Sequence, residues 1–329
     1  MRDGILVLNK PQNWTSSDCV AICRRVLGVK GIKKVGHGGT LDPMATGVLP
    51  IFVGQATRIM EYMDLDYKTY VCKARLGIIT DTLDIWGEVL EERDWHSLNI
   101  TEKAITEALE EFQGNISQMP PKYSAVRIEG KRLYEYAHKD QEISEEVRNK
   151  IKPRNVYIKN ITVNDININS GELEFEVCCS KGTYIRTICS DLGEKLGCGC
   201  TMTDLVRTAT GNISIEQAKV TADQVKTMQA EELESLLLHS DYPLIHFGEV
   251  TMPEDRADYF SRGNNIWWSQ VKVIRKPDEF CAGHKNARER DYSCIYKVYQ
   301  ENTGEFLGTG YYDADENKLK ADKVFVEKR

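Results

Sequence analysis

The sequence has 329 residues, of which 41% are apolar, so the chain is long enough to bury a sizeable core and to form two domains or one large domain with an appendage. No stretch approaches the roughly 20 apolar residues of a membrane span, and the start does not resemble a signal peptide, which predicts a soluble cytoplasmic protein. The net charge of -7 argues, taken as a whole, against a nucleic-acid partner, because phosphate contacts need clustered Lys and Arg.

Charge is distributed unevenly along the chain. Residues 1–60 contain eight Lys or Arg against three acidic residues, and residues 120–154 contain nine against six. Residues 81–111, by contrast, contain ten acidic residues against two basic ones. This pattern predicts a basic side that is suited to RNA contact and an acidic side that faces solvent. Simple solvation of both sides is the alternative interpretation.

The ten cysteines lie mostly in apolar segments. Because no signal peptide precedes them, we expect reduced thiols rather than a disulfide framework. Cys198 and Cys200, with Cys189 upstream, form the only close cluster in a polar setting, but a second ligand pair at the spacing typical of zinc sites is missing. We therefore expect buried small side chains here and no metal.

The first elements are a strand and a helix. Residues 4–9, GILVLN, have the pattern of a short buried strand, which Lys10-Pro11 ends. Thr15 to Asp18 offer helix-capping side chains, and apolar residues then recur at helical spacing as far as Leu27, which predicts an amphipathic helix. Basic residues follow on its polar face and in the next loop, namely Arg24, Arg25, Lys30, Lys33 and Lys34.

The glycine-rich segment GHGGTLDPMATGVLP, residues 36–50, is the most informative stretch of the chain. Asp42 followed by Pro43 is typical of a helix start, with Asp as the N-cap. That interpretation does not explain why three glycines and His37 crowd just upstream, where a backbone or a ligand must approach closely. A phosphate-binding loop is a further alternative, but the segment fits neither common glycine-rich phosphate motif.

The middle of the chain alternates strands and helices. In residues 67–77, Tyr70 falls on the apolar face of a predicted strand with Cys72, Ala74 and Leu76. A helix is expected over 101–113 with Gly114 as its C-cap. A strand pattern, LEFEVCC, then leads through SKGTY into a helix, so Tyr184 and Arg186 are expected at a strand-to-helix junction.

Two features suggest how the chain is divided. The polar and basic segment at about 119–153 is expected to be an insertion that leaves the core. A helix rich in leucine ends before residue 243, and three short strand patterns separated by turns follow, from YSCIYKVY to KVFVE. We therefore expect a first domain over 1–245 and a small, mostly β domain over 250–329.

Four segments in the first 210 residues or so, in this order, resemble the motifs of the TruB-type pseudouridine synthases. GHGGTLDPMATGVLP is similar to the family's catalytic aspartate motif and YKTYVCKARLGIITDTLDIWG to its tyrosine motif. QMPPKYSAVRIEGKRLYEYA resembles its RNA-contacting insertion, and SKGTYIRTICSDLG its arginine motif. Ahead of these four segments, LNKPQNWTSSD is also similar to the family's N-terminal segment. The end of the chain looks like a PUA-like module.

The resemblance implies a fold and a reaction. The fold would be α+β, with a central mixed, largely antiparallel sheet flanked by helices, plus a small, mostly β, PUA-like C-terminal domain. The reaction would be isomerisation of uridine 55 in the T arm of tRNA to pseudouridine, by base flipping and attack by an aspartate, in a free-standing monomeric enzyme without metal or organic cofactor. An enzyme acting on a stacked base must extrude it, and aromatic stacking recovers part of that energy.

The resemblance also implies roles for single residues. Asp42 would attack the flipped uridine, at C6 of the base or through the sugar, and Tyr70 would stack on the base and take part in the last proton transfer. Arg186 would pair with Asp42 and with Asp84, since a guanidinium keeps a carboxylate ionised and oriented. The remaining candidates would bind the nucleotide or the tRNA backbone: His37, Tyr184, Leu205, Lys10, Lys33 and Lys34.

Three other functions remain open at this point. A protein on the same scaffold could bind or fold tRNA without catalysis, or it could act as the catalytic subunit of a guide-dependent rRNA pseudouridine synthase. A phosphate-binding metabolic enzyme built on GHGGT is the third. Each single residue also has a structural interpretation, such as a core Tyr70 or a surface Arg186.

Overall fold

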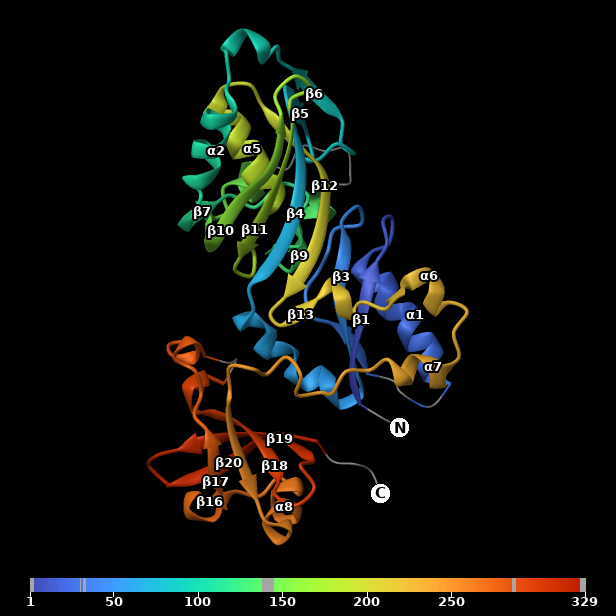
Figure 1. The fold of residues 1–329 in the computed structure, drawn as a ribbon, viewed down its shortest axis with the longest axis vertical. Coiled ribbons are helices and arrows are strands. Elements are labelled where there is room, and N and C mark those ends of the chain that lie inside the picture. The colour runs from blue at the N-terminus through green and yellow to red at the C-terminus, as the bar shows by residue number, and fades with distance from the viewer. Residues whose placement is uncertain (1–2, 30, 32–33, 138–144, 286–287, 326–329) are drawn as a thin grey trace. The chain divides into compact units, whose positions relative to one another are not determined.

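The computed structural model describes residues 3–29, 31, 34–137, 145–285 and 288–325. The chain forms two compact units (Figure 1). Unit 1 contains residues 1–42, 49–65 and 211–329, and unit 2 contains residues 43–48 and 66–210.

The N-terminal part of unit 1 is a small sheet covered by helices. Its strands have the order β14-β1-β3, with β2 on β3, and β1 and β14 are parallel. Helices α1, α6 and α7 lie together beside β1 (Figure 1). The elements are β1 (Gly4–Lys10), α1 (Ser16–Gly28), β2 (Val35–His37), β3 (Thr46–Val53), η1 (Gly54–Leu65), β13 (Ile213–Ser214), η3 (Ile215–Gln217), β14 (Val220–Thr221), α6 (Ala222–Val225) and α7 (Ala230–Ser235).

The predicted first strand and helix are confirmed. Thr15 caps α1 and forms a capping box with Asp18, whose carboxylate accepts from the Thr15 backbone N–H at 3.1 Å. This arrangement satisfies two amide groups that a helix start otherwise leaves without partners. The apolar stripe of α1, which includes Cys19, Cys23 and Leu27, is fully buried.

Unit 2 is an antiparallel sheet with two helices on one face (Figure 1). Its strand order is β3-β12-β4-β11-β10-β7, in which only the β12–β3 pair is parallel. The elements are β4 (Lys68–Leu76), β5 (Ile78–Thr80), β6 (Val89–Glu92), η2 (His96–Leu98), α2 (Glu102–Glu110), β7 (Gly114–Gln118), β8 (Arg127–Ile128), β9 (Lys131–Arg132), α3 (Leu133–Ala137), α4 (Glu145–Arg148), β10 (Arg154–Asn167), β11 (Glu172–Cys179), α5 (Ile185–Leu196) and β12 (Cys200–Thr210).

The predicted two faces of the strand around Tyr70 are confirmed. Tyr70, Cys72, Ala74 and Leu76 on β4 are buried, while the residues between them are half-buried or exposed. The strand alternates because successive side chains point to opposite faces of a sheet. Helices α2 and α5 cover the sheet with the apolar residues Ile105, Leu109, Ile188 and Leu192.

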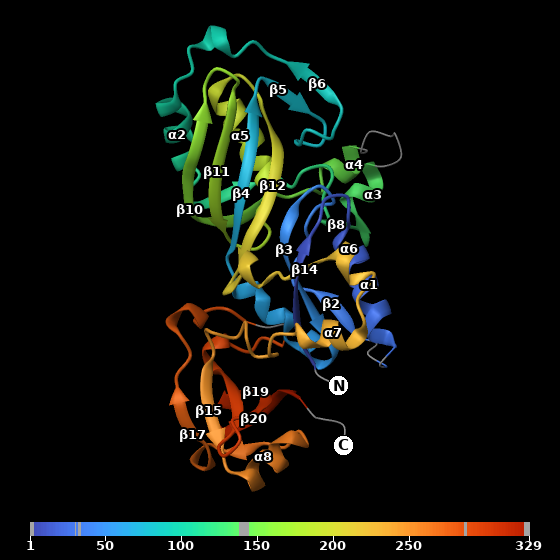
Figure 2. The ribbon, with the colours of Figure 1, turned by 45° about the vertical axis from the view of Figure 1, so that its right-hand side comes forward.

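The segment 119–153 forms a small structure of its own within unit 2. A hairpin of β8 and β9 leads into α3, and α4 follows residues 138–144, which lie outside the described part (Figure 2). Val126, Leu133 and Val147 form its apolar cluster, and Tyr184 packs against them.

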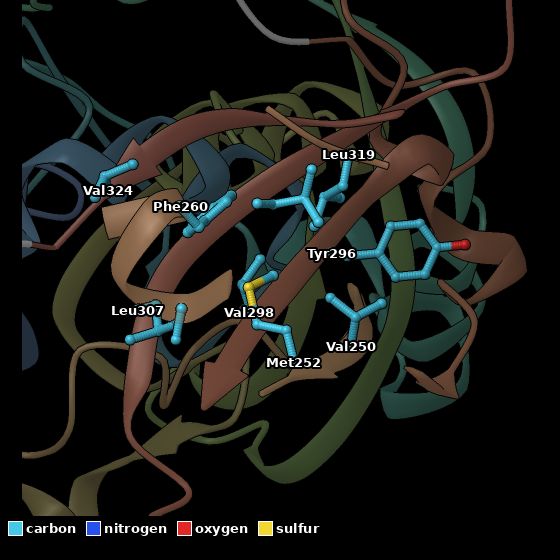
Figure 3. Close-up of a cluster of buried hydrophobic side chains, with 10 residues drawn as sticks. Val250, Met252, Phe260, Tyr296, Val298, Leu307, Leu319 and Val324 are labelled. Atoms are coloured by element: carbon cyan, nitrogen blue, oxygen red, sulfur yellow. The ribbon is translucent and has the colours of Figure 1, made fainter. Parts of the chain in front are cut away.

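The C-terminal part of unit 1 is a six-stranded sheet with the order β16-β20-β19-β18-β15-β17. Its core includes Val250, Phe260, Val298 and Leu319 (Figure 3). The prediction of a small, mostly β module is confirmed, whereas the boundary near residue 245 stays a prediction. The elements are β15 (Gly248–Met252), α8 (Glu254–Ser261), β16 (Ile266–Trp267), η4 (Trp268–Gln270), β17 (Lys272–Arg275), η5 (Glu279–Cys281), η6 (Tyr292–Cys294), β18 (Ile295–Gln300), β19 (Phe306–Asp313) and β20 (Lys318–Val324).

One alternative interpretation and one predicted helix end were wrong. Asp42-Pro43 does not start a helix, because the chain from Gly38 to Ala45 forms bends between β2 and β3. Helix α2 ends at Glu110 rather than 113, and Gly114 is the first residue of β7, with φ +92°. At Asp42-Pro43 the local sequence favours a helix start. Because β2 pairs with β3, this segment instead forms the connection of a β-hairpin.

Candidate active site

The candidate site residues are divided between the two units. Asp42, His37, Lys10 and Lys34 belong to unit 1, and the other described candidates belong to unit 2. Lys33 lies outside the described residues.

The loop that carries Asp42 is fixed by a buried serine. Ser16, the first residue of α1, donates from Oγ to the Leu41 carbonyl at 3.0 Å and accepts from the Leu41 N–H at 2.9 Å. Both backbone groups of the residue before Asp42 are therefore held by one side chain. The Asp42 side chain is half-buried. A loop residue held in this way can present its carboxylate in a defined position.

The glycines before Asp42 allow two close approaches. A Cβ atom on Gly38 would lie 2.7 Å from the Phe52 ring, and one on Gly36 would lie 2.9 Å from the Met60 sulfur. The glycines are thus explained by packing of β2 on β3 and η1. His37 ends β2, is half-buried and pairs with Ile51 in the register.

The two described lysine candidates differ in exposure. Lys10 is fully buried, and its ammonium donates to the carbonyls of Pro11 at 3.1 Å and Trp14 at 2.7 Å. We therefore assign Lys10 to ordering the turn before α1 and no longer expect it to bind a phosphate at the surface. Lys34 is exposed, and its carbonyl accepts from the Gly54 N–H at 2.8 Å.

In unit 2, Arg186 is the centre of a buried polar network. It is the second residue of α5 and only 4% exposed. Its guanidinium donates to the Thr82 carbonyl at 2.8 Å and to the Tyr123 carbonyl at 2.9 Å, and lies 3.6 Å from the Asp84 carboxylate. The predicted pairing with Asp84 is present in the structure. Buried charges need partners of this kind, since desolvation without them is costly.

Asp84 is held in a tight turn. Its carboxylate accepts from Thr82 Oγ1 at 2.7 Å, and its backbone forms a bridge to Met202 of β12. Tyr184, the N-cap residue of α5, exchanges two backbone hydrogen bonds with the Gln118 amide, at 3.0 and 3.2 Å.

Tyr70 and Leu205 lie on paired strands. Tyr70 is 8% exposed and stands opposite Arg207 of β12, while Leu205 is 6% exposed and stands opposite Cys72 of β4. The same Arg207 pairs with Gly47 of β3. Strand β12 therefore lies between β3, which begins four residues after Asp42, and β4, which carries Tyr70.

Arg207 was missed in the sequence analysis. Its side chain is fully buried, and Nε donates to the Val48 carbonyl at 2.7 Å. A Cβ atom on Gly47 would lie 2.2 Å from the Arg207 carbonyl, so only glycine permits this approach. The available signal was the period of β12, because Arg207 shares a face with the buried Leu205. Ser16 and Tyr123 were also missed and carry no comparable signal.

Eight of the ten cysteines are buried, and Cys178 and Cys294 are half-buried. Cys189 of α5 lies 3.6 Å from Cys72 of β4, measured between the sulfur atoms. Burial raises the pKa of Cys200, so this thiol is neutral near pH 7. Within the part of the chain that the structure describes, no three His, Cys, Asp or Glu side chains are grouped to hold a metal ion. No helix of the described residues is long and apolar enough to cross a membrane.

The mixed sheet with flanking helices and the small C-terminal β module form the fold that the resemblance to the pseudouridine synthases implies. The family described as "TruB family pseudouridylate synthase (N terminal domain)" matches residues 24–185, and "tRNA pseudouridylate synthase B C-terminal domain" matches residues 186–244. The chain belongs to the TruB family. Its reaction is the isomerisation of uridine to pseudouridine in tRNA.

Relatives over nearly the full length carry the same description. A protein of Clostridium tetani named tRNA pseudouridine synthase B is 40% identical over 94% of this chain and 95% of its own length. Another of that name, from Alkaliphilus oremlandii, is 42% identical over 98% and 97%.

Solved structures agree with the fold. A structure described as "Crystal Structure of a Cbf5-Nop10-Gar1 Complex" is similar with a TM-score of 0.66 and 25% identity, covering 99% of this chain and 84% of that one. A structure of an H/ACA RNP bound to a substrate RNA is similar with a TM-score of 0.68 and 22% identity, covering 98% of this chain and 85% of that one.

Proposed function

We propose that this enzyme isomerises uridine 55 in the T arm of tRNA, with Asp42 as the catalytic carboxylate. The target base is flipped out of its loop, the bond from N1 to C1′ breaks, the uracil turns, and a bond from C5 to C1′ forms. N1 takes up a proton and the C5 proton leaves, so the composition of the base is unchanged. No oxidant or water is consumed overall, so the residues have to bind and orient the base, attack it through Asp42 and move protons.

The observation that carries the proposal is the Arg186 network. A buried guanidinium that already contacts two carbonyls and Asp84 is suited to orient a second carboxylate, and we assign that carboxylate to Asp42.

The other candidates receive roles around the base. Tyr70 stacks on the flipped uracil and takes part in proton transfer, and Leu205 and Tyr184 line the same pocket. His37 helps to hold the nucleotide out of its loop. The exposed Lys34 and its neighbour Lys33 contact tRNA phosphates.

We also propose that the enzyme works in the cytoplasm as a monomer and without an obligatory protein partner. The full-length relatives named tRNA pseudouridine synthase B are 40% and 42% identical, whereas the similar chain from the Cbf5-Nop10-Gar1 complex is 25% identical. The purified chain alone should therefore modify a tRNA transcript.

Asp42→Asn tests the proposal. Because Asp42 caps no helix, the variant should keep the stability and tRNA affinity of the wild type while its turnover falls by roughly a thousandfold or more. The measurement is tritium release from tRNA labelled at C5 of uridine, with pseudouridine mapped at position 55. Appreciable release by the variant would remove Asp42 from the mechanism, and release from another position would contradict the proposed target.

A further inference from the structure

We infer that Tyr123 is a positioning residue for the isomerisation, because its hydroxyl bond to Asp81 holds the insertion at 119–153 against Arg186. This inference rests on the proposed catalytic role of Arg186. Tyr123 itself does not touch the reacting atoms in this scheme. It acts through the carbonyl oxygen that it presents to the guanidinium.

Arg186 is held from two separate segments. Nη1 donates to the Thr82 carbonyl at 2.8 Å in the turn after β5, and Nη2 donates to the Tyr123 carbonyl at 2.9 Å in the insertion. The plane of a guanidinium is fixed when two of its nitrogens are bound to different anchors. The orientation of Arg186 therefore depends on where the insertion places one carbonyl.

Tyr123 and Arg186 both bind the turn after β5. Its hydroxyl donates to Asp81 Oδ2 at 3.0 Å, while Asp81 Oδ1 accepts from the Glu88 N–H at 2.8 Å. The contacts close a ring from Arg186 through Tyr123 and Asp81 to Thr82 and back. A ring of this kind holds its members more firmly than separate pairs do.

The turn that closes the ring is tightly packed. A Cβ atom on Gly87 would lie 2.2 Å from Thr82 Oγ1 and 2.4 Å from Asp81 Oδ1. Asp81 and Thr82 are thus fixed by the backbone that passes over them. A shift of Tyr123 is transmitted to Arg186 rather than absorbed by the turn.

A second link joins the insertion to the start of α5. The ring of Tyr184 packs against the cluster of Val126, Leu133 and Val147, and its backbone is bound to Gln118 at the beginning of the insertion. Arg186 follows two residues later. The insertion therefore helps to fix the position of the Arg186 backbone as well as that of its guanidinium. Of these contacts, the Tyr123 hydroxyl bond is the one that removal of a single atom can test.

Tyr123→Phe removes the hydroxyl and keeps the ring and the carbonyl. The single-turnover rate of tritium release at saturating tRNA should fall about tenfold, while the dissociation constant for tRNA stays within about twofold, because no positive charge is lost. Tyr312→Phe is the matched control. Its hydroxyl donates to Asn317 Oδ1 at 3.3 Å in the C-terminal sheet, away from the insertion in sequence, so its rate should equal that of the wild type. Asp81→Asn, which keeps the Oδ1 acceptor of the Glu88 N–H and loses the acceptor of the Tyr123 hydroxyl, should reproduce Tyr123→Phe.

A double-mutant cycle decides whether Tyr123 acts through Arg186. In an Arg186→Lys background the fork that binds the Tyr123 carbonyl is gone, so Tyr123→Phe should lower the residual rate by less than about twofold. Equal losses in both backgrounds, a wild-type rate for Tyr123→Phe, or an effect on affinity alone would each overturn the inference. A wild-type rate for Arg186→Lys alone would instead overturn the proposed role of Arg186, and the inference with it.

Discussion

Tyr70 lies in the core, and the proposed chemistry uses the same residue. It is buried on β4 between Val177 of β11 and Arg207 of β12. Such a position suits a ring that fills space, and the same ring can stack on an extruded uracil. Burial alone does not distinguish a core tyrosine from one that takes part in the reaction. Removal of the hydroxyl does, since a core tyrosine uses it only for a hydrogen bond.

We expect the Tyr70 hydroxyl to take part in the last proton transfer. Tyr70→Phe should fold and bind tRNA as the wild type does, yet its single-turnover release of C5 tritium should fall by about a hundredfold or more. Tyr70→Leu should lose activity as well, because leucine offers no flat surface for stacking. Wild-type rates in both variants would make Tyr70 a core residue, and a wild-type rate in the Phe variant alone would limit its role to stacking.

At the scale of the element, helix α5 carries a candidate site residue and also a half-buried acid that lowers stability at neutral pH. Its first turn carries Arg186, and its apolar face, which includes Ile188 and Leu192, is fully buried. Further along, Asp191 is half-buried. Burial, with a smaller effect from the charge of Glu194, raises the pKa of Asp191 to about 6. An acid whose pKa is raised on folding favours the native state only while it is protonated.

The sign of this effect predicts a pH dependence. Below the unfolded-state pKa near 4 the native and unfolded states are equally protonated at Asp191, and stability is lost as the pH rises through about 6. Asp191→Asn should therefore raise the free energy of unfolding by about 1 to 2 kcal/mol at pH 7.5 and leave it unchanged at pH 3.5. Urea denaturation at the two pH values measures it. An equal change at both values, or a loss at pH 7.5, would contradict the raised pKa.

At the scale of the whole molecule, the C-terminal sheet is attached to η1 through buried polar contacts. The Asp322 carboxylate is fully buried and accepts from the Tyr62 hydroxyl of η1 and from Arg290 at 2.6 Å. Burial, with the nearby charge of Asp322, raises the pKa of Tyr62, so that it remains a neutral donor. Lys323 of β20 also pairs with Glu61 of η1 at 2.7 Å.

Removal of the buried carboxylate should therefore destabilise the enzyme. Asp322→Ala removes the buried carboxylate that accepts from Arg290 and Tyr62, which should lower the free energy of unfolding by about 3 kcal/mol. Glu107→Ala, which breaks an exposed pair with Lys103, should change it by less than about 0.5 kcal/mol. Thermal and urea denaturation compare the two. Similar small effects in both would show that the buried network adds nothing to this attachment.

The sequence by itself determined the features that local chemistry controls. The capping box at Thr15, the two faces of the strand around Tyr70 and the position of Arg186 at a helix start follow from spacing over a few residues, because helices and strands repeat with fixed periods. The family followed from ordered motifs, and the comparisons confirmed it. The sequence alone is therefore sufficient to predict the fold and a set of candidate residues.

Tertiary structure alone decided the partners of those residues. Arg186 binds carbonyls that lie 104 and 63 residues away in sequence, and strand register places Arg207 opposite both Gly47 and Tyr70. Lys10 reads as a surface lysine but is buried. The local sequence at Asp42 favours a helix start, but the β2–β3 hairpin and the hydrogen bonds between Ser16 and Leu41 stabilise a loop there instead. Contacts between distant segments depend on the packing of the whole chain, and no short-range pattern records them.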